Sequence, residues 1–358
     1  MVVVIEFDYH IKHHFGKLQK MKSVLSSKFI PIFSLFCLVL LSLPSPSLSA
    51  HAKCNSDDKK VLLKIKQDLN NPYHLASWNP DVDCCTWYAM KCDRNTGRVI
   101  ALTIFSGNIS GQIPPAVGDL PYLQNLEFHK LTNLTGQIPS TITKLVRLNF
   151  LRLSWTNLSG PVPSFLSQLK NLTFLDLSFN DFTGSIPPSL SELPNLLALH
   201  LDRNKLTGNI PESFGKFAGN TPDLYLSHNM LSGTIPRSFG DLNFSSWMDF
   251  SRNKLEGDAS FLFGKNKTVQ FIDLSRNLFQ FDISKVEFSE NLVYLDLNHN
   301  KIFGSLPVGL TQLQLQLFNV SYNRLCGQIP QGGKLQSFDL YSYFHNRCLC
   351  GNPLTACK

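Results

Sequence analysis

The chain lacks the short motifs that accompany most enzyme active sites. Its 358 residues contain no G-x-S-x-G turn, no H-E-x-x-H pair, no glycine-rich phosphate loop ending in Lys-Ser or Lys-Thr, and no protein-kinase signature. Acidic residues and histidines are numerous, but they recur at regular intervals instead of gathering in one segment. We therefore predict a protein that acts by binding, that is not an enzyme, and that needs neither a cofactor nor a metal.

A membrane-spanning segment is also missing. The apolar run at residues 29–43 has 15 residues and contains a proline, whereas a helix needs about 20 residues to cross a bilayer. Lysines precede this run and the small-residue site at residues 50–52 follows it, which is typical of a secretory signal. We predict an upstream extension plus a cleaved signal peptide over residues 1–52, with Met21 as an alternative start. A membrane anchor is the competing interpretation.

Charged residues are few, at 16% of the chain, and the formal net charge is +7. The first 52 residues hold five lysines and two acidic residues, so +3 of that charge lies there and residues 53–358 retain +4. A mildly basic balance suits an acidic polymer as a partner. The expected partners include neither nucleic acid nor a membrane.

Cysteine is absent from most of the chain and gathers at its two ends. Of nine cysteines, one (Cys37) lies inside the predicted signal. The other eight are Cys54, Cys84, Cys85, Cys92, Cys326, Cys348, Cys350 and Cys357. An even number in a secreted protein indicates disulfides, and the two groups argue against pairs that join the ends. The spacing does not select the pairs within each group, and zinc at Cys348 and Cys350 is the alternative.

What the chain has in abundance is one phrase, L-x-L-x-x-N-x-L-x-G-x-I-P. It recurs ten times between Val99 and Pro330 at a step of about 24 residues, and residues 175–187 and 199–211 are successive copies. A fixed period of this length is typical of a solenoid, whose repeats bury their apolar faces against one another. We predict an α/β repeat fold, a right-handed leucine-rich-repeat solenoid of about ten 24-residue repeats with a concave parallel β-sheet and disulfide-closed caps.

The segments that flank the repeats are predicted to be caps, because the end of a solenoid exposes its core and needs a polar lid. Apolar residues follow a helical spacing after residue 56, with acids in the first turn. We therefore predict an N-terminal cap over residues 53–98, leucine-rich repeats over residues 99–330, and a C-terminal cap over residues 331–358.

Two positions of the phrase are predicted to serve the backbone. The asparagine is expected to be buried where the strand turns, with its amide satisfying backbone groups there. The glycine is expected where a positive φ or close stacking is required. Thr156 replaces the asparagine in the third repeat and Phe281 replaces the glycine in the eighth, which also lacks Ile-Pro. Both could be binding features, but we favour the interpretation that they are tolerated irregularities.

Sequons for N-glycosylation are frequent. In a secreted protein several of them should carry glycans. The seven candidate asparagines are Asn108, Asn133, Asn157, Asn171, Asn243, Asn266 and Asn319. Asn319 lies in a predicted concave strand, so we expect it to be the least used.

Charges of opposite sign form separate rows on the predicted concave strands. The acidic residues are Asp176, Asp202, Asp223, Asp249, Asp273 and Asp296. A basic row, one step before each asparagine, contains Arg203, His228, Arg252, Arg276 and His299. Aromatic residues that could act as interface hot spots are Phe150, Trp155, Phe174, Phe179 and Trp247. Repeat duplication alone produces rows, but the separation of acid from base favours a binding surface. Ten strands span roughly 45 Å, which is wide enough for a protein interface.

Five segments resemble plant polygalacturonase-inhibiting proteins, which are extracellular leucine-rich-repeat proteins. They are residues 54–59 (CNSDDK), 83–88 (DCCTWY), 151–160 (LRLSWTNLSG), 254–259 (KLEGDA) and 341–350 (YSYFHNRCLC). The resemblance covers essentially all of residues 53–358. It implies a glycoprotein of the plant cell wall that binds fungal endo-polygalacturonases through its concave face and blocks pectin degradation in plant defence.

The resemblance also implies roles for particular residues. Enzyme binding would fall to Asp176, Asp202 and Asp249, and discrimination between enzymes to Leu197 and Gln270; we include the neighbouring Asp273 and Asp296 in this surface. Pectin binding would fall to His228, Arg252, Arg276 and His299, and an acidic wall is expected to protonate the two histidines in part. The implied disulfides are Cys54–Cys84, Cys85–Cys92, Cys326–Cys348 and Cys350–Cys357.

A different class of function fits the same repeats. A secreted signalling or developmental protein that docks on a receptor ectodomain or a peptide would show the same phrase. A receptor fragment is a third interpretation, which we disfavour because the predicted cap closes at Cys357, one residue before the chain ends.

Overall fold

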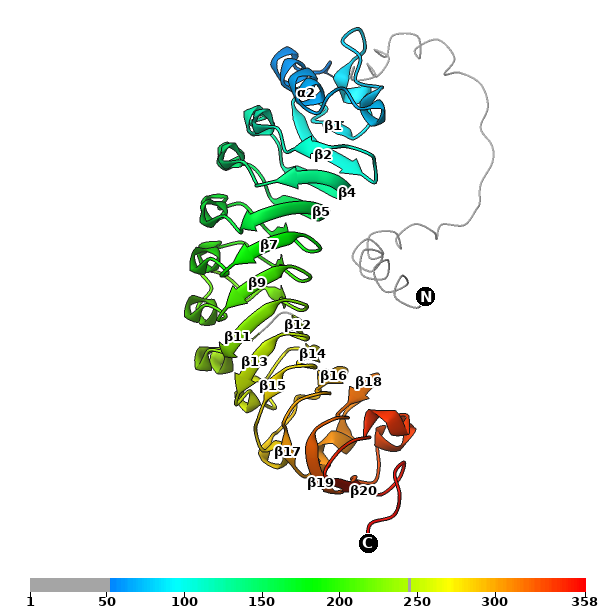
Figure 1. Cartoon of the computed structure of the whole chain (residues 1–358). Coiled ribbons are helices and arrows are strands. Elements are labelled where there is room, and N and C mark those ends of the chain that lie inside the picture. The colour runs from blue at the N-terminus through cyan, green and yellow to red at the C-terminus, as the bar shows by residue number, and fades with distance from the viewer. Residues whose placement is uncertain (1–51, 244–245) are drawn as a thin grey trace, which may run out of the picture. The chain divides into compact units, whose positions relative to one another are not determined.

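A computed structural model describes residues 52–243 and 246–358, which form one stack of repeats (Figure 1). The predicted extension and signal peptide, with Cys37, lie outside the described residues except for Ala52. No helix among the described residues has the length and hydropathy needed to cross a bilayer.

The N-terminal end is covered by helix α2 (Ser56–Asp68), as the helical spacing predicts. Asn55 caps the helix, because its side-chain oxygen accepts hydrogen bonds from the backbone N–H groups of Asp57 and Asp58 at 3.0 and 3.2 Å. The buried Asp58 carboxylate in turn accepts from the Val99 N–H at 2.8 Å and pairs with Arg98 at 2.7 Å. One acidic side chain therefore ties the cap to the first repeat. The predicted boundaries at residues 98/99 and 330/331 stay a prediction.

The first strands of the repeats form a parallel sheet. Each strand pairs in register with the equivalent strand one repeat away. The strands are β2 (Val99–Phe105), β4 (Asn125–Gly136), β5 (Phe150–Pro161), β6 (Phe174–Asp176), β8 (Ala198–His200), β10 (Asp223–Tyr225), β12 (Trp247–Asp249), β14 (Phe271–Asp273), β16 (Tyr294–Asp296) and β18 (Leu317–Asn319). These ten strands confirm the prediction of a leucine-rich-repeat fold with a parallel sheet.

Shorter second strands follow the asparagine of most repeats and pair with one another. They are β3 (Gly111–Gln112), β7 (Asp181–Gly184), β9 (Lys205–Gly208), β11 (Met230–Thr234), β13 (Lys254–Gly257), β15 (Leu278–Phe279), β17 (Phe303–Gly304) and β19 (Arg324–Gln328). At the ends of the stack, β1 (Met90–Cys92) pairs antiparallel with β2, and β20 (Cys348–Cys350) pairs with β19. The second repeat's extra residue is absorbed by a register shift between Leu131 and Thr135 of β4.

Single turns of 3-10 helix return the chain on the outer side of the stack (Figure 1). Those in the repeats are η3 (Pro115–Asp119), η4 (Ser140–Lys144), η5 (Ser164–Gln168), η6 (Pro188–Glu192), η7 (Glu212–Gly215), η8 (Arg237–Asp241), η9 (Ser260–Leu262), η10 (Ile283–Lys285) and η11 (Val308–Gln312). Those in the flanking segments are η1 (Tyr73–Leu75), η2 (Cys84–Thr86), η12 (Leu335–Ser337) and η13 (Leu340–Ser342). The core between strands and helices is continuous, since inward residues such as Leu175 and Leu177 are fully buried.

The asparagines of the phrase connect neighbouring repeats. The Asn204 side-chain amide donates to the carbonyl oxygens of Leu177, Leu201 and Asp202 at 2.9, 3.0 and 3.2 Å. Its side-chain oxygen accepts from the Phe182 N–H at 3.0 Å. The predicted role of the asparagine is thus confirmed, although Asn253 and Asn300 are half-buried instead of buried. In the third repeat, Thr156 stands in place of the asparagine, and its hydroxyl donates a hydrogen bond to the Asn180 side-chain oxygen.

Two disulfides lie in each end segment. They join Cys54 to Cys84, Cys85 to Cys92, Cys326 to Cys348 and Cys350 to Cys357. These are the pairs that the family resemblance implies. The four N-terminal sulfur atoms lie within 4.8 Å of one another, but all four are in disulfides and therefore do not act as thiolate ligands.

Candidate binding surface

The concave face is formed by the side chains that point outward from the first strands. Because side chains alternate along a strand, these outward residues form columns that run from repeat to repeat. The middle column contains Glu127, Arg152, Asp176, His200, Tyr225, Asp249, Asp273, Asp296 and Asn319. Asp202 stands two residues beyond this column. The predicted enzyme-binding carboxyls therefore lie on one face, with the repeat of Tyr225 between Asp202 and Asp249.

Most carboxylates of the middle column also serve their own strand. The Asp249 carboxylate accepts hydrogen bonds from the Ser251 N–H and hydroxyl at 3.0 and 2.7 Å. Asp176 holds Ser178 in the same way at 2.9 and 2.6 Å, and Asp273 and Asp296 accept the N–H two residues later. The acidic row therefore has a structural role that the sequence analysis did not predict. The sequence pattern that could have indicated this role is an Asp followed two residues later by Ser or Asn.

Arg152 neutralises the N-terminal end of the acidic row. Its guanidinium lies 2.9 Å from the Glu127 carboxylate and 3.1 Å from the Asp176 carboxylate. Burial alone would raise the pKa of Asp176, but His200, Ser178 and Arg152 together hold that pKa below its usual value. Asp176 is therefore an ionised and already paired group, less suited to receive a new cation than the acids beyond it.

Asp202 differs from the other acids of the face. Its side chain is only 7% exposed, and no other described residue donates a hydrogen bond to its carboxyl or pairs with it. Burial, followed by the charges of Asp176 and Asp249, raises the pKa of Asp202 well above its usual value. Burial also raises the pKa of Asp249, Asp273 and Asp296. The row therefore carries less negative charge in the free protein than its formal count.

The basic row lies along one edge of the concave face and has an unusual backbone. Arg203, His228, Arg252 and Arg276 each have a φ of 54°, in the left-handed region. Residues other than glycine rarely adopt this backbone conformation. In each repeat it directs one side chain outward at the end of the strand. Rings extend the row at the C-terminal end, where His299, Tyr322 and His345 stack at 4.0 and 4.2 Å. Sequence reasoning missed Tyr322 and His345, although both occupy the position before an asparagine.

Burial and neighbouring arginine charges oppose the expected protonation of the two histidines. Burial, followed by the charges of Arg203, Arg252 and Arg276, lowers the pKa of His228 to about 4. Burial also lowers the pKa of His299. The charge of Arg276 contributes next to this shift, and that of Arg252 contributes less. An acidic medium near pH 5 therefore leaves His228 largely neutral in the free protein. The permanent charge of the row comes from its arginines.

Aromatic rings form a ladder across the concave face. His200 stacks on Tyr225 at 3.9 Å between ring centroids, and Phe271 lies between Trp247 and Tyr294 at 3.4 and 3.7 Å. Phe150 and Phe174 stack at 4.6 Å at the N-terminal end. Rings stacked in this way cover one another's faces and leave their edges for a partner. The ladder is an apolar, preordered ridge beside the carboxyls.

The two residues expected to discriminate between enzymes occupy equivalent places. Leu197 is 52% exposed and Gln270 is exposed, each one residue before its strand, β8 or β14. Three repeats separate them, or roughly 14 Å. They lie at the edge of the face opposite the basic row. The carboxyls thus lie between this edge and the arginines.

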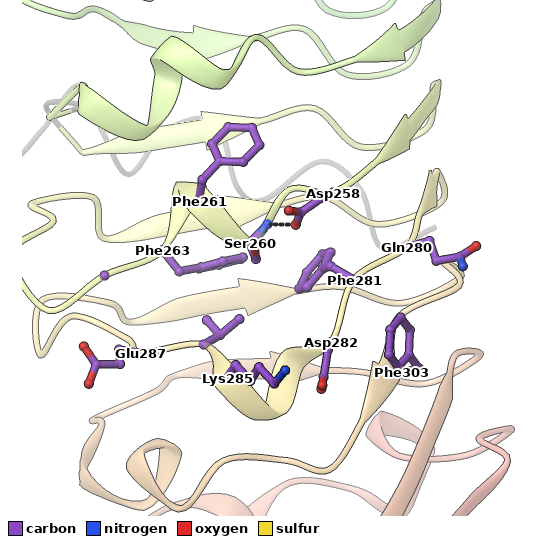
Figure 2. A pocket seen from close by; sticks show the side chains of 12 residues that line it. Asp258, Ser260, Phe261, Phe263, Gln280, Phe281, Asp282, Lys285, Glu287 and Phe303 are labelled. Carbon is purple, nitrogen blue, oxygen red and sulfur yellow. Dashed lines mark hydrogen bonds between the residues drawn. The ribbon is translucent and has the colours of Figure 1, made fainter.

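An open cleft lies outside the concave face. Its volume is about 680 Å³, and Figure 2 shows its walls around Phe263 and Phe281. Its lining residues come from η9, η10 and the segments before and after them, and from Phe303 of β17. The cleft therefore coincides with the eighth repeat, where the phrase loses its glycine and Ile-Pro.

The sequon asparagines are mostly accessible. Asn108, Asn133, Asn157, Asn171 and Asn266 are exposed. Asn319 is half-buried, and its side-chain oxygen accepts from the Ser321 N–H and hydroxyl at 3.0 and 2.8 Å. Asn243 is exposed, but the next two residues of its sequon are outside the described residues. Glycosylation at these positions stays a prediction.

Comparison with known proteins identifies relatives over nearly the whole chain. The leucine-rich-repeat N-terminal domain model matches residues 55–93, and the leucine-rich-repeat model matches residues 171–193, 195–217, 223–242 and 291–313. A polygalacturonase inhibitor from Pyrus communis is 70% identical over 93% of this chain and 98% of the relative. One from Vitis vinifera is 68% identical over 93% and 99%.

A solved structure shares the fold. The crystal structure of a plant ice-binding protein has a TM-score of 0.84 and 56% sequence identity, covering 86% of this chain and 99% of that one. The relatives are inhibitors and leucine-rich-repeat proteins, so the prediction that this chain is not an enzyme is confirmed. The two relatives and the shared repeats show that the chain belongs to the plant polygalacturonase-inhibitor family of leucine-rich-repeat proteins.

Proposed function

We propose that this protein is secreted to the plant cell wall, binds fungal endo-polygalacturonases through its concave face, and blocks their access to pectin. The observation that carries the proposal is the face itself, where the buried carboxyl of Asp202, which lacks a partner among the described residues, and half-buried carboxyls such as that of Asp249 lie beside a preordered aromatic ridge. Such a surface offers an apolar centre and charge-selective contacts to another protein. It offers no reacting group, so inhibition would come from occlusion of the enzyme.

Within this interface the carboxyls would receive basic groups of the enzyme. Asp202 and Asp249 are the strongest candidates, because Asp176 already pairs with Arg152. Asp273 and Asp296 would extend the contact toward the C-terminal repeats. A lysine or arginine that reaches Asp202 would supply the partner that its buried carboxyl lacks, and such desolvated pairs favour one partner strongly over others.

Selectivity between enzymes would depend on Leu197 and Gln270. Both are exposed at one edge of the face, and their hydrogen bonds to neighbouring repeats are made by backbone atoms, which a side-chain substitution retains. Substitution of Gln270 by Lys should change the range of enzymes bound and leave thermal unfolding unchanged. A general loss of folding in that variant would contradict the assignment.

Pectin would be a second ligand, as the family resemblance implies. The row of Arg252, Arg276, His228 and His299 would bind the carboxylates of homogalacturonan, with Arg203 at its N-terminal end. The two arginines supply charge at any physiological pH, whereas the histidines would take up protons only as the polyanion arrives. Binding should therefore be accompanied by proton uptake, which is measurable by calorimetry in buffers of different ionisation enthalpy.

The direct test is a reducing-sugar assay of several fungal endo-polygalacturonases with and without the purified protein. The proposal predicts inhibition of at least one enzyme, with an effect that weakens as salt rises, because the contacts are partly electrostatic. No inhibition across a broad panel would contradict the proposal. That result, together with binding to a receptor ectodomain or a peptide, would favour the signalling alternative.

A further inference from the structure

We propose that the cleft between the seventh and eighth repeats binds a neutral saccharide of one or two residues. This site shares no residue with the concave face and is independent of the proposed inhibition. Its volume of about 680 Å³ lies in the range of about 300–1,000 Å³ that is usual for small-molecule pockets. Figure 2 shows the charged and amide side chains around aromatic rings.

The cleft lies where two successive repeats lack the proline of the Ile-Pro pair, and the seventh repeat lacks the isoleucine as well. The seventh repeat has Ala259-Ser260 and the eighth Ile283-Ser284 where other repeats have Ile-Pro. Phe263 and Phe281 fill the space beneath, and both are almost fully buried, with ring centroids 6.2 Å apart. The floor of the cleft is therefore apolar and held in place by core packing.

Charge at the rim is balanced. Asp258 pairs with Arg237 at 3.2 Å and Glu287 pairs with Lys265 at 3.0 Å. The remaining acid, Asp282, lies close enough to Lys285 for the two charges to attract each other. A cleft whose charges are compensated gives little advantage to a cation or an anion. An uncharged ligand with many hydroxyl groups matches it better.

Hydrogen-bonding groups at the rim are suited to hydroxyls. The Asp282 carboxylate is oriented by the Ser284 N–H and hydroxyl, both of which donate to one of its oxygens, at 3.0 and 2.6 Å. Its second oxygen can accept from a ligand, the Gln280 amide can donate and accept, and the Lys285 ammonium can donate. Gly304 permits this arrangement, since a Cβ there would collide with the Asp282 oxygen and its φ is +93°.

Phe303 supplies the ring platform that a pyranose needs. It is 41% exposed, and its backbone N–H donates to the Phe281 carbonyl at 3.1 Å, which fixes the residue at the edge of the cleft. No aromatic ring among the described residues stacks on it, in contrast to the concave ladder, where neighbouring rings cover one another. A free ring face can pack against the C–H groups of a sugar, whereas stacked rings cannot.

The test is saturation-transfer NMR and calorimetry of the purified full-length secreted protein with neutral trisaccharides of glucose, xylose, mannose and galactose, and with trigalacturonate as the charged comparator. We expect at least one neutral sugar to bind. Phe303→Leu keeps the apolar bulk but removes the ring, and should weaken that binding at least tenfold. Phe105→Ala, an equally exposed phenylalanine at 44% outside the cleft, should leave it unchanged.

The outcomes are decisive in either direction. Binding that Phe303→Leu abolishes while thermal unfolding and polygalacturonase inhibition stay unchanged would support the site and separate it from the concave face. Absence of binding by every neutral sugar would overturn the proposal. So would binding that both phenylalanine variants affect equally, or a preference for trigalacturonate that depends on Phe303.

Discussion

The Asp249 carboxylate accepts a hydrogen bond from the Ser251 hydroxyl at 2.7 Å, so an acid of the candidate interface also stabilises its own strand. The equivalent position in the last repeat is Asn319, whose side-chain oxygen accepts from Ser321 in the same way. An amide can therefore keep the strand's hydrogen bonds while removing the charge. This relationship makes it practical to separate folding from binding.

We predict that Asp249→Asn is at least as stable as the unmodified protein at neutral pH, because burial raises the pKa of the carboxyl that it replaces. Asp249→Ala should be less stable than Asp249→Asn by about 1 kcal/mol, because the Ser251 groups lose their acceptor. Equilibrium unfolding in urea, followed by circular dichroism, measures both. Equal destabilisation by the two substitutions would contradict the role assigned to the hydrogen bonds.

Substitution of Asn204 by Ala should be far more costly. It removes four buried hydrogen bonds, two of which join neighbouring repeats, and we expect a loss of at least about 3 kcal/mol in the free energy of unfolding. Asn195→Ala is the matched control, since Asn195 is exposed and its side chain makes one hydrogen bond, to the Lys170 carbonyl at 2.9 Å. A loss for Asn204→Ala no larger than that of the control would refute the connecting role of the asparagines.

Stability should fall as pH rises above about 4, because burial and the neighbouring Asp176 and Asp249 raise the pKa of Asp202 in the folded protein. The folded state then holds a proton that the unfolded state has released, so the stabilising contribution is complete below the unfolded pKa and is lost as pH rises through the folded pKa. Asp202→Asn should flatten this dependence and be the more stable protein at pH 7. Parallel pH curves for both proteins would contradict the prediction.

The ring of His228 should titrate near pH 4, where NMR can follow it. Because Arg252 repels the protonated ring, Arg252→Gln should raise the pKa of His228. Arg147→Gln provides the control, since that guanidinium lies over Tyr122, on an edge of another repeat. A His228 pKa near the ordinary 6.5, or one insensitive to Arg252, would restore the expectation of a fully charged row.

The repeat phrase predicts most of the fold because each position has one dominant physical task. Leu175 and Leu177 must be buried, and Asn180 must satisfy a turn, so periodicity alone places them. The family resemblance likewise places Asp202 and Gln270 on one face. The inferences on the leucines and the asparagine rest on positions that the repeats share, whereas those on Asp202 and Gln270 rest on the family resemblance.

Features that depend on contacts between particular repeats could not be predicted in this way. The pairing of Arg152 with Asp176 joins one repeat to the next and changes which acids are available to a partner. The low pKa of His228 arises from burial, followed by the charges of three arginines in other repeats. The sequence beside Phe281 indicates an irregular repeat but not a cleft, because a missing Ile-Pro shows only that a space is unfilled and not what lines it.

The central claim is that carboxyls of the concave face bind the target enzyme. The most direct measurement is the affinity of an inhibited endo-polygalacturonase for a double variant that carries both Asp202→Asn and Asp249→Asn. We predict at least a tenfold loss of affinity and a weaker salt dependence, with a stability in urea no lower than that of the unmodified protein. Glu192→Gln, which removes an acid from the outer helix η6, should bind as the unmodified protein does. Unchanged affinity of the double variant would contradict the claim.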